Sequence, residues 1–268
     1  LTNVNGNISL LEQDTVTTQT ETVVQANNRD GNNPTSDTDM WSINYDSRMV
    51  RVGETINGVF TPQSTGFIIG EHLIATASHC VCNIHPGYSL FNPYRSVTAY
   101  LYTVEDDSIV STPYELTVTS VHVPLNFVQS LNASFYEYGL IEVEEDLSDF
   151  GCFNLGIITD YAPTSSDGQD EDLLLLRLQQ FQNPNAPLYT EEQKKYPLLV
   201  DGWLRGIGLQ QISMGSSTSQ GSSGSVIYLH DNNTAVGIIW GTNQSATRIT
   251  RPLLQFYLNN QYITDYDT

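Results

Sequence analysis

Two short segments of the sequence combine residue types that support nucleophilic catalysis. The hydrophobic run Leu73–Val81 carries His79 near its end, and the glycine-containing segment Gly221–Ser225 carries Ser223 at its centre. A histidine fixed at the end of a strand can accept the proton of a serine hydroxyl and later return it to a leaving group. Glycines beside the serine allow a tight turn whose backbone N–H groups point at one spot, as in an oxyanion hole. The two segments therefore predict a hydrolytic site built from a serine and a histidine.

These segments resemble the motifs of a known enzyme family. Thr76-Ala-Ser-His79-Cys80 is similar to the histidine motif of chymotrypsin-like serine proteases, and Gly221-Ser-Ser223-Gly-Ser225 to their nucleophile motif. The serine after the second glycine resembles the bacterial branch that includes the glutamyl endopeptidases, the V8-protease group and the exfoliative toxins. Three further segments match in the family's order. Tyr138–Ile141 resembles the strand after the acidic triad residue, and Val236–Gly241 resembles the strand that lines the substrate cleft. Thr247–Thr250 resembles the last strand before the C-terminal helix.

The resemblance implies a role for each matching residue. His79 corresponds to the general base and Ser223 to the nucleophile, while the N–H groups of Gly221 and Ser223 correspond to the oxyanion hole. The chain would then be a secreted serine endopeptidase that hydrolyses peptide bonds through an acyl-enzyme. Its partners would be protein or peptide substrates, with no cofactor and no metal, and the chain is expected to be a monomer.

The third triad position departs from the family. The family has an aspartate directly before the strand at Tyr138–Ile141, and this chain has Glu137 there; Asp146 and Asp149 come only after the strand. Glutamate can also accept the Nδ1–H of an imidazole and hold its tautomer, although its side chain is one methylene longer. We therefore predict a Ser-His-Glu triad. The alternative is a solvated Glu137 and a catalytically weak or inactive binding or adhesion protein on the same fold.

The resemblance also indicates which residues contact the side chain before the scissile bond. Ser217, six residues before Ser223, is neutral, which argues against a trypsin-like preference for Arg or Lys. Thr218 matches the glutamyl endopeptidases, but Ile239 stands where they have a histidine, and a buried substrate carboxylate needs charged partners. Arg248 is an alternative partner, so an acidic and a small, apolar or uncharged preference both stay open. The predicted substrate-binding residues are Ser217, Thr218, Ile239, Trp240 and Gly241.

The elements that must position these residues are short strands. Pro252 suits the first turn of a helix, and Leu253, Leu254, Tyr257 and Leu258 recur at helical spacing after it. The sequence predicts an all-β fold of two antiparallel six-stranded β-barrels, chymotrypsin-like, with a C-terminal α-helix. Runs rich in β-branched and aromatic residues, separated by Gly, Pro, Asn and Asp, predict strands at Met49–Val52, Phe67–Ile69, Leu73–Ala77, Val97–Val104, Leu116–Val123, Tyr138–Val143, Leu173–Phe181, Gly206–Ser213, Ser225–Leu229, Ala235–Trp240 and Thr247–Thr250.

Three regions are expected along the chain. Residues 1–39 are polar and acidic and read as a leader or propeptide remnant. Residues 40–155 would form the barrel that carries His79 and Glu137. Residues 156–268 would form the barrel that carries Ser223, together with the C-terminal helix. The loop-like stretch Tyr161–Asp170 separates the two groups of strands.

Charge and composition exclude several partners. The 268 residues include 30 Asp and Glu against 10 Lys and Arg, for a net charge of −20. Nucleic acids and anionic membranes are therefore not expected as partners, because both are bound through Lys and Arg. The longest Leu/Ile/Val/Phe run, Leu173–Leu176, is too short for a membrane span. The polar surface, with lysine only at Lys194 and Lys195, is common in exported proteins and favours an extracellular location.

The three cysteines leave their pairing open. Cys80 and Cys82 are too close to bridge each other comfortably, and Cys152 could pair with either. His79, Cys80, Cys82 and His85 have spacings that a zinc site can use, but there is no second His/Cys group. In the animal enzymes of the family, the cysteine that corresponds to Cys80 forms a disulfide with a cysteine on the preceding strand. The corresponding stretch here, Ser64–Phe67, has no cysteine, so the resemblance implies that Cys80 is a buried thiol.

Overall fold

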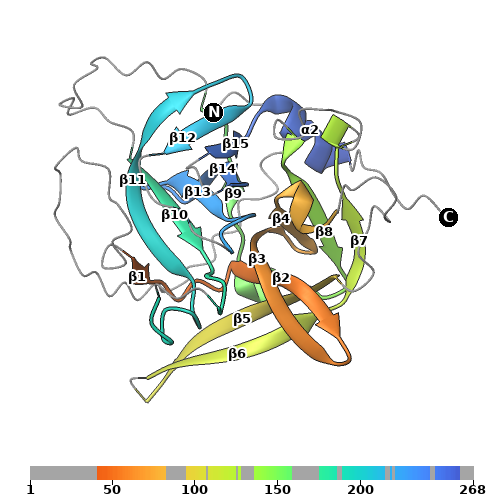
Figure 1. Cartoon of the computed structure of the whole chain (residues 1–268), viewed down its shortest axis with the longest axis vertical. Coiled ribbons are helices and arrows are strands. Elements are labelled where there is room, and N and C mark those ends of the chain that lie inside the picture. Colours follow the sequence, from red (N-terminus) through yellow and green to blue (C-terminus); the bar gives the residue numbers. More distant parts are fainter. Residues whose placement is uncertain are drawn as a thin grey trace.

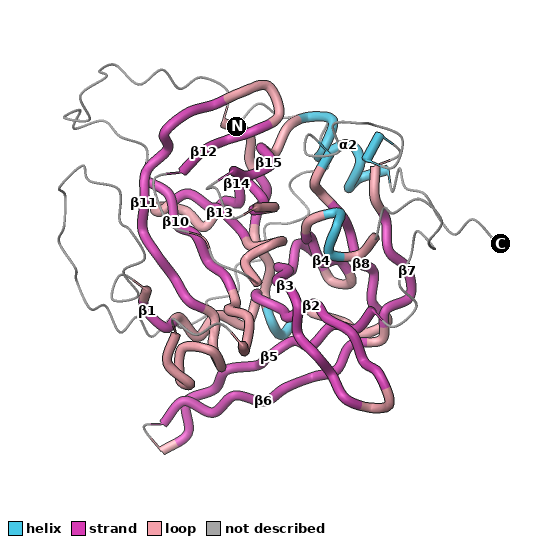
Figure 2. The backbone as a smooth tube through the Cα atoms, in the orientation of Figure 1, coloured by secondary structure: helices cyan, strands magenta, loops and turns pink. Residues whose placement is uncertain are grey.

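The computed structural model describes residues 41–82, 95–106, 108–124, 126–127, 136–158, 175–185, 189–214, 218, 221–241 and 245–259. The predicted leader at residues 1–39, the loop Tyr161–Asp170, His85 and Ser217 lie outside them. Figure 2 shows that strands, in magenta, make up most of the described chain. The helix α2 (Arg251–Asn259) follows the last strand, close to the predicted start at Pro252.

The first sheet carries the histidine motif at the end of its strand β4. Its antiparallel neighbours follow the order β6-β5-β2-β3-β4-β8-β7, and β7 returns close to β5. No ladder joins these two strands within the described residues, so this sheet is a curled half-barrel. Asn57 and Gly58 connect β2 to β3 with φ of +52° and +77°, as a two-residue hairpin turn requires. Its strands are β2 (Met49–Ile56), β3 (Val59–Gly70), β4 (Leu73–Thr76), β5 (Arg95–Glu105), β6 (Ser108–Leu116), β7 (Val118–His122) and β8 (Gly139–Val143).

The second sheet closes into a barrel. The order β11-β10-β13-β14-β15-β12 returns to its start because β12 also pairs with β11. Two short strands extend it, β1 along β11 and β9 parallel to β14. Figure 1 shows the two sheets side by side, the first in orange to green and the second mainly in cyan and blue. The strands are β1 (Ser42–Ile43), β9 (Asn154–Leu155), β10 (Leu175–Gln180), β11 (Leu198–Ile207), β12 (Gln211–Met214), β13 (Val226–Leu229), β14 (Thr234–Ile239) and β15 (Ser245–Arg248).

The predicted fold class is confirmed, with one strand assigned wrongly. Gly206–Ser213 is not a single strand but the end of β11, a turn and most of β12. The Gly208 N–H donates to the Gln211 carbonyl at 2.8 Å and closes this turn. Leu209 made the segment look continuous, yet its side chain is 93% exposed at the turn. The polar strand β6, most of β11, the first part of β3 and the two-residue strands β1 and β9 were not predicted.

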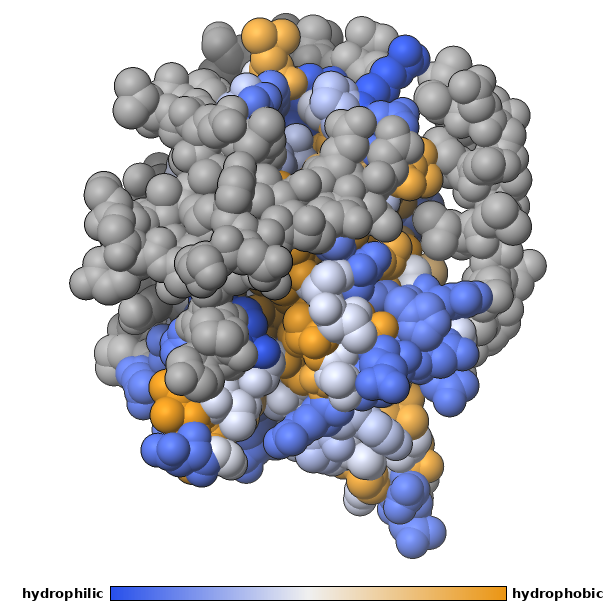
Figure 3. All heavy atoms as spheres, turned by 90° about the vertical axis from the view of Figure 1, so that its right-hand side faces the viewer, coloured by the Kyte–Doolittle hydropathy of each residue, from blue (hydrophilic) through white to orange (hydrophobic). Residues whose placement is uncertain are grey.

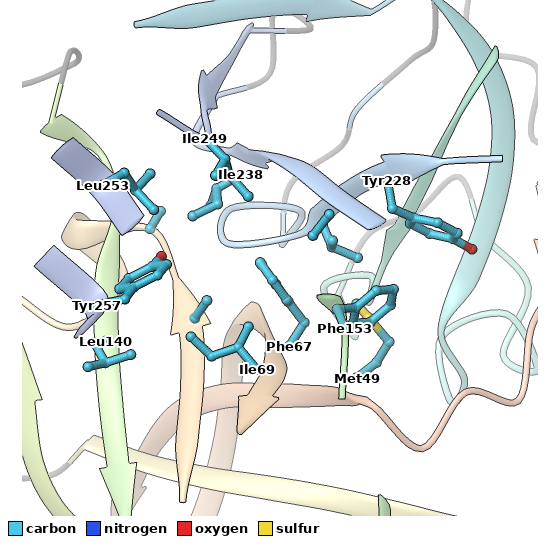
Figure 4. Close-up of a cluster of buried hydrophobic side chains, with 14 of the residues drawn as sticks. Met49, Phe67, Ile69, Leu140, Phe153, Tyr228, Ile238, Ile249, Leu253 and Tyr257 are labelled. Atoms are coloured by element: carbon cyan, nitrogen blue, oxygen red, sulfur yellow. The ribbon is translucent and has the colours of Figure 1, made fainter. Parts of the chain in front are cut away.

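A large hydrophobic core lies between the two sheets. Its members come from both sheets and from α2, which inserts Leu253, Phe256 and Tyr257. Figure 4 shows Met49, Phe67, Ile69, Leu140 and Phe153 facing Tyr228, Ile238 and Ile249 across this core. Burial of apolar area of this kind is the main stabilising contribution in folding. It holds the two barrels, and the motifs that they carry, in one arrangement.

The face drawn in Figure 3 is mainly polar where its residues are described. In Figure 3, hydrophilic side chains lie around smaller groups of hydrophobic ones. Large exposed hydrophobic residues include Ile56 and Val59 beside the β2–β3 turn and Val104 near the end of β5. Within the described part of the chain, no helix combines the length and apolar character needed to cross a membrane.

Candidate active site

The segment with His79 leaves β4 and turns at once. Ser78–Cys80 form a single 3₁₀ turn, in which the Cys80 N–H donates to the Ala77 carbonyl at 3.0 Å. The His79 side chain is 40% exposed while Ser78 and Cys80 are buried. The end of a buried strand thus presents one imidazole to solvent.

Glu137 is placed by a tight turn of its own. The Tyr138 N–H donates to the Tyr136 carbonyl at 2.9 Å, which makes Glu137 the central residue of a three-residue γ-turn. The Ser78 hydroxyl lies within hydrogen-bond distance of the same Tyr136 carbonyl (2.9 Å) and of the Tyr138 carbonyl (2.8 Å). Thr247 of β15 donates its hydroxyl to the Glu137 carbonyl at 3.1 Å. Both barrels therefore fix the backbone that carries the longer acidic side chain.

The carboxylate of Glu137 meets the imidazole of His79. Oε2 lies 2.9 Å from Nδ1 and also accepts the backbone N–H of His79 at 3.2 Å. Glu137 is 8% exposed, so this pair is shielded on the carboxylate side. A carboxylate accepts from a protonated Nδ1, and the neutral imidazole then keeps a free lone pair on Nε2. This is the arrangement that a general base requires.

Two opposing effects act on the pKa of His79. Desolvation by burial lowers it, while the neighbouring Cys80 sulfur and the Glu137 carboxylate raise it, and the pKa ends well above its usual value. The Cys80 thiol shows the complementary behaviour. Burial raises its pKa, but the imidazole and the hydroxyls of Ser64 and Thr76 lower it, and the net shift is downward. A negative environment thus stabilises the imidazolium that forms when His79 takes a proton.

Ser223 lies in a turn that depends on two glycines. Gly221 and Gly224 have φ of +98° and +84°, a region that residues with a Cβ rarely adopt. A Cβ on Gly224 would lie 2.0 Å from the Thr65 carbonyl oxygen and 2.2 Å from Thr76 Oγ1. The turn therefore packs directly against β3 and against the end of β4, three residues before His79.

The groups of the predicted oxyanion hole are available. Neither the Gly221 N–H nor the Ser223 N–H donates a hydrogen bond to any residue that the structure describes. The neighbouring groups are fixed, because the Gly224 N–H donates to the Ile239 carbonyl at 2.7 Å and the Ser225 N–H to the Ser222 carbonyl at 2.9 Å. Ser223 and His79 both lie in the described part of the chain, and no hydrogen bond connects Ser223 Oγ to His79 Nε2. Catalytic hydrogen bonds are often long without substrate and tighten in the complex.

The predicted substrate-binding residues have different environments. The Thr218 hydroxyl donates to the Gly241 carbonyl at 3.2 Å, which brings these two together. A Cβ on Gly241 would meet no atom within 4 Å, so the backbone there borders open space. Trp240 is half-buried against the core between the barrels. Ile239 has no exposed surface and packs inside the second barrel, so it meets the nucleophile turn through its backbone.

Arg248 is occupied elsewhere. Its Nη1 donates to the Gly208 carbonyl at 3.0 Å, and its Nη2 donates to the Ile158 carbonyl. The guanidinium thus ties the β11–β12 turn to the segment after β9. Its two terminal nitrogens both bind backbone carbonyls.

A second Ser-His-Glu group lies on β7 and β8 and has a different connectivity. His122 Nε2 is 2.9 Å from Ser120 Oγ and 3.1 Å from Glu142 Oε2, and the serine hydroxyl donates to Glu142. The serine proton is therefore directed at the carboxylate and not at the imidazole. His122 is 1% exposed, which closes this group to a substrate.

Three residues that shape the site were not singled out in the sequence. Ser78 is next to His79 in the sequence, but its role could not be predicted because the carbonyls that it contacts are 58 and 60 positions away. Thr65 and Thr247 bond residues more than a hundred positions away, so no local pattern marked them. The cysteines are now resolved as free thiols, with Cys80 and Cys82 buried, as the resemblance implied for Cys80. Among the described residues no group of three or more His, Cys, Asp or Glu could hold a metal ion.

Comparison with known proteins gives matches in structure. No protein-family model and no curated protein sequence matches the chain. A Glu endopeptidase in complex with MPD is similar with a TM-score of 0.58 and 15% identity, over 80% of this chain and 90% of that one. Human heparin binding protein is similar with a TM-score of 0.54 and 9% identity at the same coverage. The chain therefore has the fold of chymotrypsin-like serine proteases.

Proposed function

We propose that this chain is a serine endopeptidase of chymotrypsin-like fold, with Ser223 as nucleophile, His79 as general base and Glu137 as the acid that orients it. The observation that carries the proposal is the 2.9 Å contact between Glu137 Oε2 and His79 Nδ1, on an imidazole that is partly exposed to solvent. The glycine turn with Ser223, packed against the strand that leads to His79, supports it.

The proposed reaction proceeds through a covalent intermediate. His79 Nε2 takes the Ser223 proton as Oγ bonds to the substrate carbonyl carbon, and the resulting oxyanion accepts from the N–H groups of Gly221 and Ser223. The C–N bond then breaks, and the imidazolium gives its proton to the leaving amine. Water, deprotonated by the same imidazole, hydrolyses the acyl-enzyme and restores Ser223. Glu137 keeps the proton on Nδ1 and stabilises the imidazolium in both halves.

For specificity we propose a preference for small or uncharged side chains before the scissile bond. The Ser225 that follows Gly224 supports membership of the glutamyl-endopeptidase branch. Ile239 supplies no side-chain donor, however, and Arg248 binds backbone carbonyls, which leaves a substrate carboxylate without a charged partner from either residue. A mixed peptide library tests this, and predominant cleavage after Glu or Asp would contradict it.

The second candidate is a binding protein on the same fold. It is favoured by a structural neighbour that is named for binding and not for catalysis. Heparin itself is a poor candidate ligand for this chain, because a net charge of −20 repels a polyanion.

A fluorophosphonate probe separates the two candidates, because it reacts covalently only with an activated serine. We expect the parent chain to be labelled once, on Ser223, and to cleave peptides. Ser223→Ala should abolish both while leaving the circular dichroism spectrum unchanged. Ser222→Ala is the matched control and should retain labelling. A parent chain that is folded but neither labelled nor active would favour the binding protein.

A further inference from the structure

We propose that Thr65 is a positioning residue for the nucleophile turn, and that its hydroxyl keeps the Ser223 N–H oriented toward the substrate. The inference rests on the proposed function, because it assigns a supporting group to the same oxyanion hole. Thr65 lies on β3 of the first sheet, whereas the turn leads into β13 of the second (both strands are labelled in Figure 1), and hydrogen bonds join the two.

Thr65 makes three contacts with the second barrel. Its hydroxyl donates to the Gly221 carbonyl at 3.0 Å and accepts the Phe181 N–H at 3.1 Å. Its backbone N–H donates to the Ser223 carbonyl at 2.9 Å. The residue has no exposed surface, so water does not compete for these groups.

These contacts fix the two peptide groups that flank the peptide between Ser222 and Ser223, which carries the Ser223 N–H. The Gly221 carbonyl belongs to the peptide before Ser222–Ser223, and the Ser223 carbonyl to the peptide after it. With both carbonyls fixed on β3, little freedom remains for the peptide between them, which carries the Ser223 N–H. An oxyanion hole acts by donors that are already oriented before the reaction, so this restriction serves catalysis.

Thr65 is in turn held by a residue of the adjacent strand β4 and by the turn itself. The Thr76 hydroxyl donates to the Thr65 carbonyl at 2.7 Å, and the backbone of Gly224 packs against that carbonyl. The branched Cβ restricts the side chain to few rotamers, which favours a fixed hydroxyl. Valine has the same shape without the hydroxyl, and serine keeps the hydroxyl without the methyl group.

The test compares Thr65→Val, Thr65→Ser and Ile68→Val with the parent enzyme. Ile68→Val lies on the same strand, in the core of the first barrel, and controls for lost stability. We expect Thr65→Val to lower kcat about 100-fold, the loss typical of one oxyanion donor, with KM and the pH midpoint of kcat/KM little changed. Thr65→Ser should recover most of this loss, and Ile68→Val should retain parental kcat at a comparable melting temperature. Parental kcat in Thr65→Val, no recovery in Thr65→Ser, or an equal loss in Ile68→Val would overturn the proposal.

A second measurement does not depend on activity. Hydrogen exchange followed by mass spectrometry reports the amide of Gly224, which is bonded to the Ile239 carbonyl of β14, and that of Ser225, which is bonded to the Ser222 carbonyl within the turn. We expect faster exchange across residues 221–225 in Thr65→Val than in Ile68→Val. If the parent is neither active nor labelled, the proposed function fails, while exchange still decides whether Thr65 orients the turn. Unchanged exchange would contradict the role of Thr65 itself.

Discussion

At the scale of single residues, the most informative feature is the contact of a buried glutamate, Glu137, with the imidazole of His79. The backbone around Glu137 forms a γ-turn, and hydroxyls of Ser78 and Thr247 bind the three carbonyls of residues 136–138. The carboxylate thereby reaches both the Nδ1 and the backbone N–H of His79. The site uses the additional methylene through local backbone geometry, so the shorter acid should fit it poorly.

This geometry predicts the effects of two substitutions at Glu137. Glu137→Gln keeps the size but can offer an N–H to the imidazole and favour the wrong tautomer, so kcat/KM should fall by roughly three to four orders of magnitude. Glu137→Asp keeps the charge on a backbone arranged for a longer side chain and should lose about 10-fold or more through misplacement. Near-parental kcat/KM in the Gln variant would show that another group, or none, orients His79.

The raised pKa of His79 predicts the pH dependence of the reaction. In the proposed mechanism His79 must be neutral to act as general base, so kcat/KM should rise with pH through the pKa of His79, with a midpoint above the ordinary value of about 6.5. Because the Cys80 sulfur contributes to raising this pKa, Cys80→Ala should move the midpoint to lower pH. Cys82→Ala is the matched control, since that thiol is also buried but does not contribute to the pKa of His79. A midpoint that is unchanged in Cys80→Ala would contradict the coupling.

At the scale of elements, the glycine turn and the two strands beneath it act as a unit. Gly224→Ala should abolish labelling and turnover, because the new Cβ would lie 2.0 Å from the Thr65 carbonyl oxygen. Gly58→Ala is a close control. Gly58 has a similar φ of +77°, but a Cβ there meets nothing within 4 Å. It should cost only backbone strain, of order 1–3 kcal/mol by chemical denaturation, and retain activity. Equal activity in both variants would mean that contact with β3 does not matter.

The sequence was most informative where the evidence is local. The segment with His79 lies at the end of a strand, as its hydrophobic pattern predicted, and the segment with Ser223 lies in a turn, as its glycines predicted. The C-terminal helix α2 forms where apolar residues recur at helical spacing. Contacts between distant segments were not predictable, because nothing in Thr65 or Thr247 distinguishes them from other threonines. Leu209 led to a wrong prediction, because an apolar residue at an exposed turn made β11 and β12 look like one strand. The sequence also did not predict that only the second sheet closes into a barrel. Closure depends on which strands pair, and the sequence of a single strand does not specify its partners.

At the scale of the whole molecule, both ends of the described chain contribute to the core. Trp41 is buried in the second barrel and β1 pairs with β11, while α2 fills the space between the barrels. The first described residues thus belong to the barrel that is built mainly from the later half of the chain. Their removal should affect the second barrel first.

Two truncations test this. Removing residues 1–39 keeps Trp41 and β1, so we expect the melting temperature to change by a few degrees at most. Removing residues 1–43 also deletes the buried tryptophan, whose loss typically costs about 3–5 kcal/mol. At roughly 2–4 °C per kcal/mol for a chain of this size, the midpoint should fall by at least ~6 °C. A large fall with the shorter truncation would show instead that residues 1–39 are part of the folded unit.

The core between the barrels has a consequence for when the proposed chemistry can occur. His79 and Glu137 lie on one barrel and Ser223 on the other, and α2 inserts Leu253, Phe256 and Tyr257 between them. A chain still being synthesised therefore lacks an assembled site until the residues of α2 have been made. Such a protease would stay inert for as long as its chain is incomplete or unfolded. Its own completed folding would serve as the activation step.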